Sequence, residues 1–226
     1  MLDSRNWLAR LDAVVFDLDG TLVQLTIDFR QMRSEVYGLA ERYGVVVDER
    51  RRQALALEFV AETTAELRRQ SLQLAERFHT QAHAAIEAIE LAAARQAGLF
   101  AGVPELLNWL HQRGLRLGVI TRNCRLAAGA ALASLEPLMG VILTRDDVPA
   151  VKPHPVHLGR ALEVLGVSGG RTLVVGDHPL DVVTGKAAGA YTAGVLQPGE
   201  TPERFAAVAP DLVLNGVIEL RAHLSA

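Results

Sequence analysis

The chain has 226 residues, of which 50% are hydrophobic and 22% are charged, and its formal net charge is −3. This balance predicts a globular protein with a sizeable core, built as one large domain or as a core with a smaller second domain. The basic residues form no run longer than Arg50–Arg52, which makes nucleic acid a poor candidate partner. Cys124 is the only cysteine, so an intrachain disulfide is excluded and a reducing compartment is expected.

The first residues, from Met1 to Trp7, lack the apolar core of a signal peptide. No window of the sequence approaches the about 18 uninterrupted apolar residues that a membrane-spanning helix needs. We therefore expect a cytoplasmic protein that does not associate with a membrane.

The apolar residues Ala13–Phe16 lead directly into the turn Asp17–Thr21. A continuous apolar run that ends at a glycine turn is typical of a strand buried on both faces of a parallel sheet. Asp17 then lies at the carboxyl end of the strand, where open α/β sheets bind ligands. Two carboxylates about 4 Å apart repel each other by roughly 4 kcal/mol, so we expect Asp17 and Asp19 to face a cation, a shared proton or an electrophile. The alternative is a polar turn that serves only the backbone.

A region without any strand pattern follows, from about residue 24 to residue 98. Its apolar residues recur at steps of three and four. The three helical stretches cover about 28–43, 49–69 and 70–97. Asp28 is expected to cap the first helix and Gly44 to stop it. An insertion of about 75 residues is too long for a loop, so we predict a helical cap domain joined by linkers near 22–26 and 97–103.

Strand and helix patterns alternate through the rest of the chain. The predicted strands cover 115–121, 140–144, 172–177, 191–196 and 211–214, and the predicted helices cover 103–113, 124–135, 155–166 and 180–189. This alternation predicts βαβ units and a parallel sheet. The predicted fold is thus α/β, with a Rossmann-like core of residues 1–23 and 99–226, helices on both faces of its sheet, and an all-helical cap of residues 24–98.

Thr121 closes the second core strand, and Arg122 and Asn123 follow it before a helix. A hydroxyl beside the unpaired N–H groups of a helix N-terminus is a ready anion site. A threonine or asparagine that only caps the helix is the alternative. The Arg122 side chain reaches either a substrate or the solvent.

Lys152 lies in a short loop that also contains two prolines, which fix the direction of the loop. Lys152 and Lys186 are the only lysines among 23 basic residues, and arginine does not replace lysine where a compact charge is needed. An ammonium in this loop can neutralise both a phosphate and a cluster of carboxylates. A solvated loop lysine is the alternative. His154 and His157 lack ligand spacing to other histidines or cysteines, so we expect loop and helix residues rather than metal ligands.

Asp177 ends another apolar strand, and Asp181 follows where it can cap the next helix. Together with Asp17 and Asp19, these residues place four carboxylates at one edge of the sheet. Hard oxygen ligands of this number and charge suit Mg²⁺, which keeps waters and accepts substrate phosphate. For Asp181 alone, a purely structural cap is the alternative.

In this order, the motifs resemble those of the haloacid dehalogenase-like hydrolase superfamily. The residues Phe16–Thr21 resemble its first motif, Thr121 its second, Lys152 its third, and Asp177 with Asp181 its fourth. The resemblance covers about 11–22 and 99–220, whereas the cap is similar only in location and helicity. A helical cap directly after the first motif is similar to the phosphoglycolate-phosphatase-like subgroup.

The resemblance implies a Mg²⁺-dependent phosphatase that hydrolyses a small phosphomonoester, phosphoglycolate-like or a sugar phosphate. It implies Asp17 as the nucleophile that forms an aspartyl-phosphate and Asp19 as the general acid and base. Thr121, Arg122, Asn123 and Lys152 would bind the substrate. The implied metal ligands are the Asp17 carboxylate, the Asp19 backbone carbonyl and the Asp177 carboxylate, with Asp181 behind them, and the cap is expected to select the leaving group.

Other functions stay open at this point. A phosphomutase uses the same nucleophile, and a catalytically inactive relative would only bind phosphate. A haloalkanoate dehalogenase would need no Mg²⁺ and have little use for Asp19. A signalling receiver domain also places an aspartate, a threonine and a lysine at strand ends, but its acceptor is not on the first strand. Both a monomer and a homodimer remain open.

Overall fold

The computed structural model describes residues 7–24 and 27–225. Residues 1–6 of the predicted N-terminal segment, and residues 25 and 26 of the predicted first linker, lie outside the described residues. Contacts divide the chain into two compact units, one formed by residues 1–25 and 97–226 and the other by 26–96.

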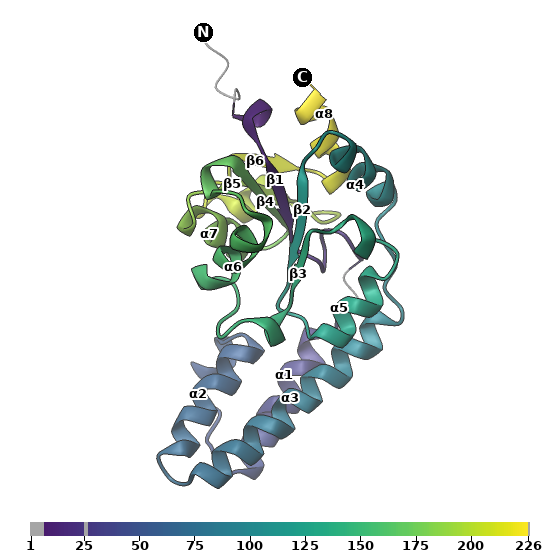
Figure 1. Cartoon of the computed structure of the whole chain (residues 1–226). Coiled ribbons are helices and arrows are strands. Elements are labelled where there is room, and N and C mark those ends of the chain that lie inside the picture. The colour runs from purple at the N-terminus through teal and green to yellow at the C-terminus, as the bar shows by residue number, and fades with distance from the viewer. Residues whose placement is uncertain (1–6, 25–26, 226) are drawn as a thin grey trace. The chain divides into compact units, whose positions relative to one another are not determined.

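The first unit contains a sheet of six parallel strands in the order β3-β2-β1-β4-β5-β6 within the described residues (Figure 1). The strands are β1 (Ala13–Phe16), β2 (Arg116–Ile120), β3 (Val141–Leu143), β4 (Thr172–Gly176), β5 (Tyr191–Val195) and β6 (Leu212–Leu214). Phe16 at the end of β1 pairs with Val119 of β2 and Val175 of β4. The order reverses between β1 and β4, and ligands of open α/β sheets bind outside the carboxyl ends at such a point.

Helices cover both faces of this sheet, as Figure 1 shows. They are α4 (Val103–Gln112), α5 (Arg125–Leu132), α6 (Pro155–Leu165), α7 (Pro179–Ala187) and α8 (Leu220–Ser225). Successive side chains of a strand point to opposite faces. Val14 and Phe16 accordingly pack in one apolar cluster with α4, α5 and α8, whereas Ala13 and Val15 pack in another with α6. The predicted α/β fold, with a first strand buried on both faces, is confirmed.

Short 3₁₀ turns complete the chain at Leu8–Arg10, Arg51–Gln53, Glu136–Leu138, Arg145–Asp147, Gly169–Arg171, Pro202–Phe205 and Val217–Glu219. Neither these turns nor α8 were expected from the sequence. Each has six residues or fewer, which is too short for a hydrophobic period to become visible.

The second unit consists of α1 (Phe29–Arg42), α2 (Ala56–Arg68) and α3 (Leu72–Ala94), packed around an apolar core of their own. Asp28 caps α1 as expected, because its carboxylate accepts the N–H groups of the second and third helical residues. Gly44 follows the helix with a φ of +77°, a left-handed conformation that glycine adopts without strain. None of the described helices is long and apolar enough to cross a membrane.

Candidate active site

The loop after β1 brings the first aspartate against the end of β4. Gly20 has a φ of +78°, and a Cβ atom on it would lie 2.2 Å from the Asp177 Oδ2 atom. Only glycine therefore allows both the left-handed turn and the close approach of the Asp177 carboxylate. Gly20, which the sequence places in the turn after Asp17, is thus required for the geometry of the site.

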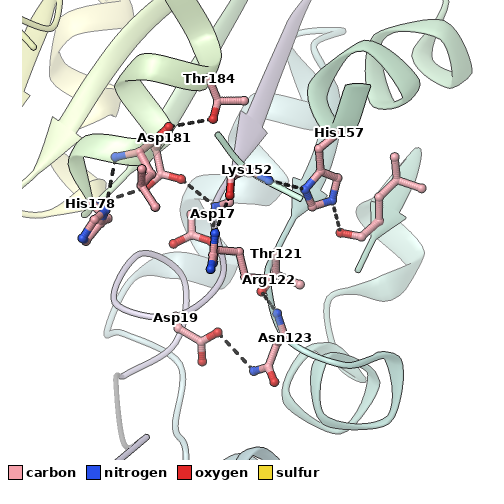
Figure 2. Close-up of polar contacts among 12 residues, drawn as sticks. Asp17, Asp19, Thr121, Arg122, Asn123, Lys152, His157, His178, Asp181 and Thr184 are labelled. Atoms are coloured by element: carbon pink, nitrogen blue, oxygen red, sulfur yellow. Dashed lines mark hydrogen bonds and ion pairs between the residues drawn. The ribbon is translucent and has the colours of Figure 1, made fainter. Parts of the chain in front are cut away.

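Lys152 is the centre of the ionic contacts, as Figure 2 shows. Its Nζ atom donates to Asp17 Oδ1 and to Asp181 Oδ1, each at 2.6 Å. The residue is 2% exposed, so a solvated loop lysine is excluded. The ammonium links the end of β1 to the start of α7, two segments that lie far apart in the sequence.

Three carboxylates gather beside this ammonium. Asp17, Asp177 and Asp181 are all buried, and each offers one oxygen within 4.8 Å of the others. Asp181 takes part in capping α7, as predicted, although it is not the N-cap residue itself. His178 is the N-cap, and Asp181 is the third helical residue, whose Oδ2 atom accepts the backbone N–H of His178 in a capping box. Both carboxylate oxygens of Asp181 thus have partners within the protein, Lys152 and His178.

Burial and like charge dominate the electrostatics of this cluster. Burial, followed by the negative charges of Asp17 and Asp181, raises the pKa of Asp177 to about 8. Burial also raises the pKa of Asp17, and the Lys152 ammonium offsets this only in part. Burial acts to lower the pKa of Lys152, but the Asp17 and Asp181 carboxylates raise it above its usual value. The raised pKa values show that one lysine does not balance the charge of three carboxylates, and a divalent cation with a preference for oxygen ligands would balance it.

Asp19 stands apart from the three carboxylates. It is partly exposed, and its Oδ2 atom accepts a hydrogen bond of 3.1 Å from the Asn123 side-chain amide (Figure 2). Among the described residues, the carboxylates that lie close enough together to bind one metal ion are those of Asp17, Asp177 and Asp181, without that of Asp19. Its backbone carbonyl as a metal ligand stays a prediction.

The loop after β2 brings Thr121, Arg122 and Asn123 to the same edge of the sheet. Thr121 is 1% exposed, and its hydroxyl accepts the backbone N–H of Asn123 at 3.1 Å. Helix α5 is capped by Cys124, not by the preceding threonine or asparagine. The Arg122 guanidinium donates to the backbone carbonyl of Lys152 at 2.5 Å, a partner that the sequence alternatives of substrate and solvent did not include.

Two further side chains reach the site from the segment after β5. The Gln197 amide donates to the Gly20 carbonyl and, at 3.4 Å, to Asp177 Oδ2. Arg204 Nε donates to the Asp177 carbonyl at 3.1 Å. Sequence reasoning missed both residues, because no motif or period marks a side chain that contacts a backbone carbonyl across the fold.

Fold and site together define an α/β protein with a parallel sheet and a centre of carboxylates and a lysine at the carboxyl ends of β1 and β4. The sequence pattern of a family described as haloacid dehalogenase-like hydrolase matches residues 11–189. The chain belongs to this family, as the motifs led us to expect.

Individual relatives match part or all of the chain. Pyrophosphatase PpaX of Anoxybacillus flavithermus is 35% identical over 120 residues, which are 52% of this chain and 56% of that protein. Pyrophosphatase PpaX of Bacillus pumilus is 37% identical over 126 residues, 55% of this chain and 58% of that protein. The chain thus matches little more than half the length of these relatives. The structure of a predicted phosphoglycolate phosphatase from Haemophilus somnus has a TM-score of 0.64 at 18% identity, covering 94% of this chain and 97% of that chain, and shares the fold.

Proposed function

We propose that the protein is a Mg²⁺-dependent phosphatase that hydrolyses a small phosphomonoester through an aspartyl-phosphate on Asp17. The observation that carries this proposal is the buried Lys152 ammonium, 2.6 Å from Asp17 Oδ1, beside a group of three carboxylates. Such a centre attracts a cation and a phosphoryl group together, since each balances part of the charge of the other. The names of the relatives, pyrophosphatase and phosphoglycolate phosphatase, support a phosphorylated substrate.

The two aspartates of the first motif have different surroundings, which suit different roles. Asp17 is buried and held by Lys152, which orients the carboxylate for in-line attack on phosphorus. Asp19 is partly exposed and accepts a hydrogen bond from the Asn123 amide, so its carboxyl group can exchange a proton with a substrate or a water. In the proposed reaction, Asp19 protonates the leaving oxygen as its bond to phosphorus breaks. It then takes a proton from the water that cleaves the aspartyl-phosphate.

Charge on the transferring phosphoryl group would be neutralised by residues of two loops. Lys152 supplies a fixed positive charge, and Thr121 lies in the loop that leads from β2 to α5, where its hydroxyl can donate to a phosphoryl oxygen. Mg²⁺ would be held by the Asp17 and Asp177 carboxylates and the Asp19 carbonyl, and would neutralise negative charge on the phosphoryl oxygens.

The test is hydrolysis of p-nitrophenyl phosphate and of a panel of phosphorylated metabolites by the purified protein with Mg²⁺. Release of many equivalents of phosphate, stopped by EDTA, is the expected result. A single equivalent retained on the protein, or turnover that survives EDTA, would contradict the proposal. Among the metabolites, phosphoglycolate and sugar phosphates are the first to compare.

Pyrophosphate is the second candidate substrate, because both relatives are named pyrophosphatase. Its leaving group is a phosphate, which needs less help from a general acid than an alkoxide does. If Asp19 is the general acid, Asp19→Asn lowers kcat/KM for an alkyl phosphate more than kcat/KM for pyrophosphate. This parameter covers the steps up to release of the leaving group and not the later hydrolysis of the aspartyl-phosphate, which both substrates share. Equal losses of kcat/KM on both substrates would argue against this role of Asp19.

A further inference from the structure

His157 lies in the first turn of α6, directly beside the Lys152 backbone (Figure 2). The residue is 0% exposed. Its Nδ1 atom is 3.2 Å from the Lys152 backbone nitrogen, and its Nε2 atom is 3.2 Å from the carbonyl oxygen of Leu143 at the end of β3. The ring therefore connects a core strand to the peptide group of the catalytic lysine.

These two contacts require one form of the ring. A backbone N–H can only donate, so Nδ1 must carry a lone pair toward Lys152. A carbonyl oxygen can only accept, so Nε2 must carry the proton toward Leu143. Only the neutral Nε2–H tautomer satisfies both contacts. Burial and the nearby charge of Lys152 lower the pKa of His157 to about 4, which keeps the ring neutral.

The two peptide groups that flank the Lys152 Cα atom are each held by a side chain. His157 accepts the N–H of the first, and Arg122 donates to the carbonyl oxygen of the second. The Lys152 side chain then continues to Asp17 and Asp181. A shift of the Lys152 backbone would move the ammonium out of reach of one or both carboxylates.

We propose that His157 is a positioning residue, whose neutral imidazole ties the Lys152 backbone to β3 and thereby sets the ammonium between Asp17 and Asp181. It is neither a metal ligand nor an acid or base of the reaction, because both ring nitrogens are engaged inside the core. The consequence for catalysis rests on the proposed phosphatase function, whereas the placement of the ammonium does not.

The first experiment tests the tautomer in the wild-type protein. Nitrogen-15 NMR of the imidazole rings distinguishes the two neutral tautomers and the imidazolium, and the His157 signal is identified by its loss in His157→Asn. We expect the Nε2–H tautomer at neutral pH. The Nδ1–H tautomer or a charged ring would overturn the proposal. This test needs a folded variant only to identify the signal, and His157→Leu serves for this purpose if His157→Asn does not fold.

The second experiment observes Lys152 directly. The chain has only two lysines, so a protein labelled with carbon-13 at the lysine ε position gives two side-chain signals, and Lys186→Arg identifies them. His157→Leu keeps much of the volume of the ring but removes the acceptor, whereas His157→Asn keeps an acceptor near the position of Nδ1. The matched control is His154→Asn, since His154 caps α6 on the exposed side and an asparagine preserves the cap.

We expect His157→Leu to shift the Lys152 signal and to lower kcat by roughly 10- to 100-fold, because small displacements of a catalytic group have effects of this size. In His157→Asn, the Lys152 signal and kcat should both lie closer to their wild-type values. In His154→Asn, both should equal the wild-type values. A folded His157→Leu protein with an unchanged Lys152 signal would overturn the proposal. If the wild-type protein hydrolyses no phosphate ester, the proposed function fails, but the Lys152 signal still tests the placement.

Discussion

Each end of β1 carries an aspartate that is paired with a basic residue, but the two pairs differ in their environment. At the amino end, Asp12 pairs with Arg171, and the two side chains are 40% and 49% exposed. At the carboxyl end, Asp17 pairs with Lys152, and the side chains are 12% and 3% exposed. The hydrogen bond from Arg171 lowers the pKa of Asp12, whereas burial raises the pKa of Asp17 despite its lysine.

The difference shows what burial adds to an ion pair. Exposed pairs are screened by water and contribute little to stability. A buried pair costs desolvation energy, so it is weak support for the fold and more typical of a functional site. The carboxyl ends of parallel strands are also where α/β proteins bind ligands. We therefore expect substitutions at the two ends of β1 to have very different consequences.

The largest difference is expected between Asp17→Asn and Asp12→Asn. The first removes the proposed nucleophile, and we expect phosphatase activity to fall by roughly 10⁴-fold or more. The second removes an exposed charge, and activity should stay near that of the wild type. Steady-state kinetics of both variants, with circular dichroism to verify folding, makes the comparison. If Asp17→Asn turned over substrate as fast as the wild type, Asp17 could not be the nucleophile.

The basic partners of the two pairs provide the next comparison. Lys152→Met should lower kcat by about 10³-fold, because a fixed charge at the transferring group is lost. It also leaves Asp17 and Asp181 buried without a counter-charge, which should lower the free energy of unfolding by about 3–5 kcal/mol. Arg171→Met should leave both quantities nearly unchanged. If the two substitutions lowered the free energy of unfolding in urea equally, the proposed difference between the two ends of β1 would be contradicted.

A smaller effect is expected from Gln197→Ala, which also acts at the carboxyl end. Its amide holds the Asp177 carboxylate against the Gly20 loop, so its loss should weaken Mg²⁺ binding by about 10-fold. Isothermal titration of the metal-free protein with Mg²⁺ measures this directly. Asp177→Asn is the comparison variant and should weaken binding further. An unchanged affinity in Gln197→Ala would show that the amide does not position the ligand.

The last effect concerns stability rather than activity, and it arises from the pH dependence of His157, which lies beside the Lys152 backbone. Burial lowers the pKa of His157 to about 4, against about 6.5 in an unfolded chain, so the unfolded chain binds more protons between these two pH values. The contribution of His157 to stability is therefore present above about pH 6.5 and is lost as the pH falls toward 4. The total is at most on the order of 3 kcal/mol. In His157→Asn, the free energy of unfolding should therefore fall less steeply than in the wild type as the pH is lowered from 6.5 to 4. Equal slopes for the two proteins would contradict the lowered pKa of His157.

Much of the fold could be predicted from the sequence, because strands buried on both faces leave long apolar runs. The bounds of β1 were predicted to the residue, and its Asp-x-Asp-Gly-Thr turn marked the site. The contacts of His157 and Gln197 could not be predicted, because each depends on backbone groups brought close only by the fold. The capping box of α7 could be predicted only for its Asp181 half, because histidine is not a preferred N-cap and His178 was not considered.

The most direct test of the central claim is to trap the covalent intermediate. Acid quenching during turnover, followed by proteolysis and mass spectrometry, should find one phosphoryl group on the peptide that contains Asp17, and none in Asp17→Asn. A phosphoryl group on any other residue would contradict the role of Asp17 as the nucleophile. So would a burst of product without a phosphorylated peptide, because a burst means that a covalent intermediate accumulates.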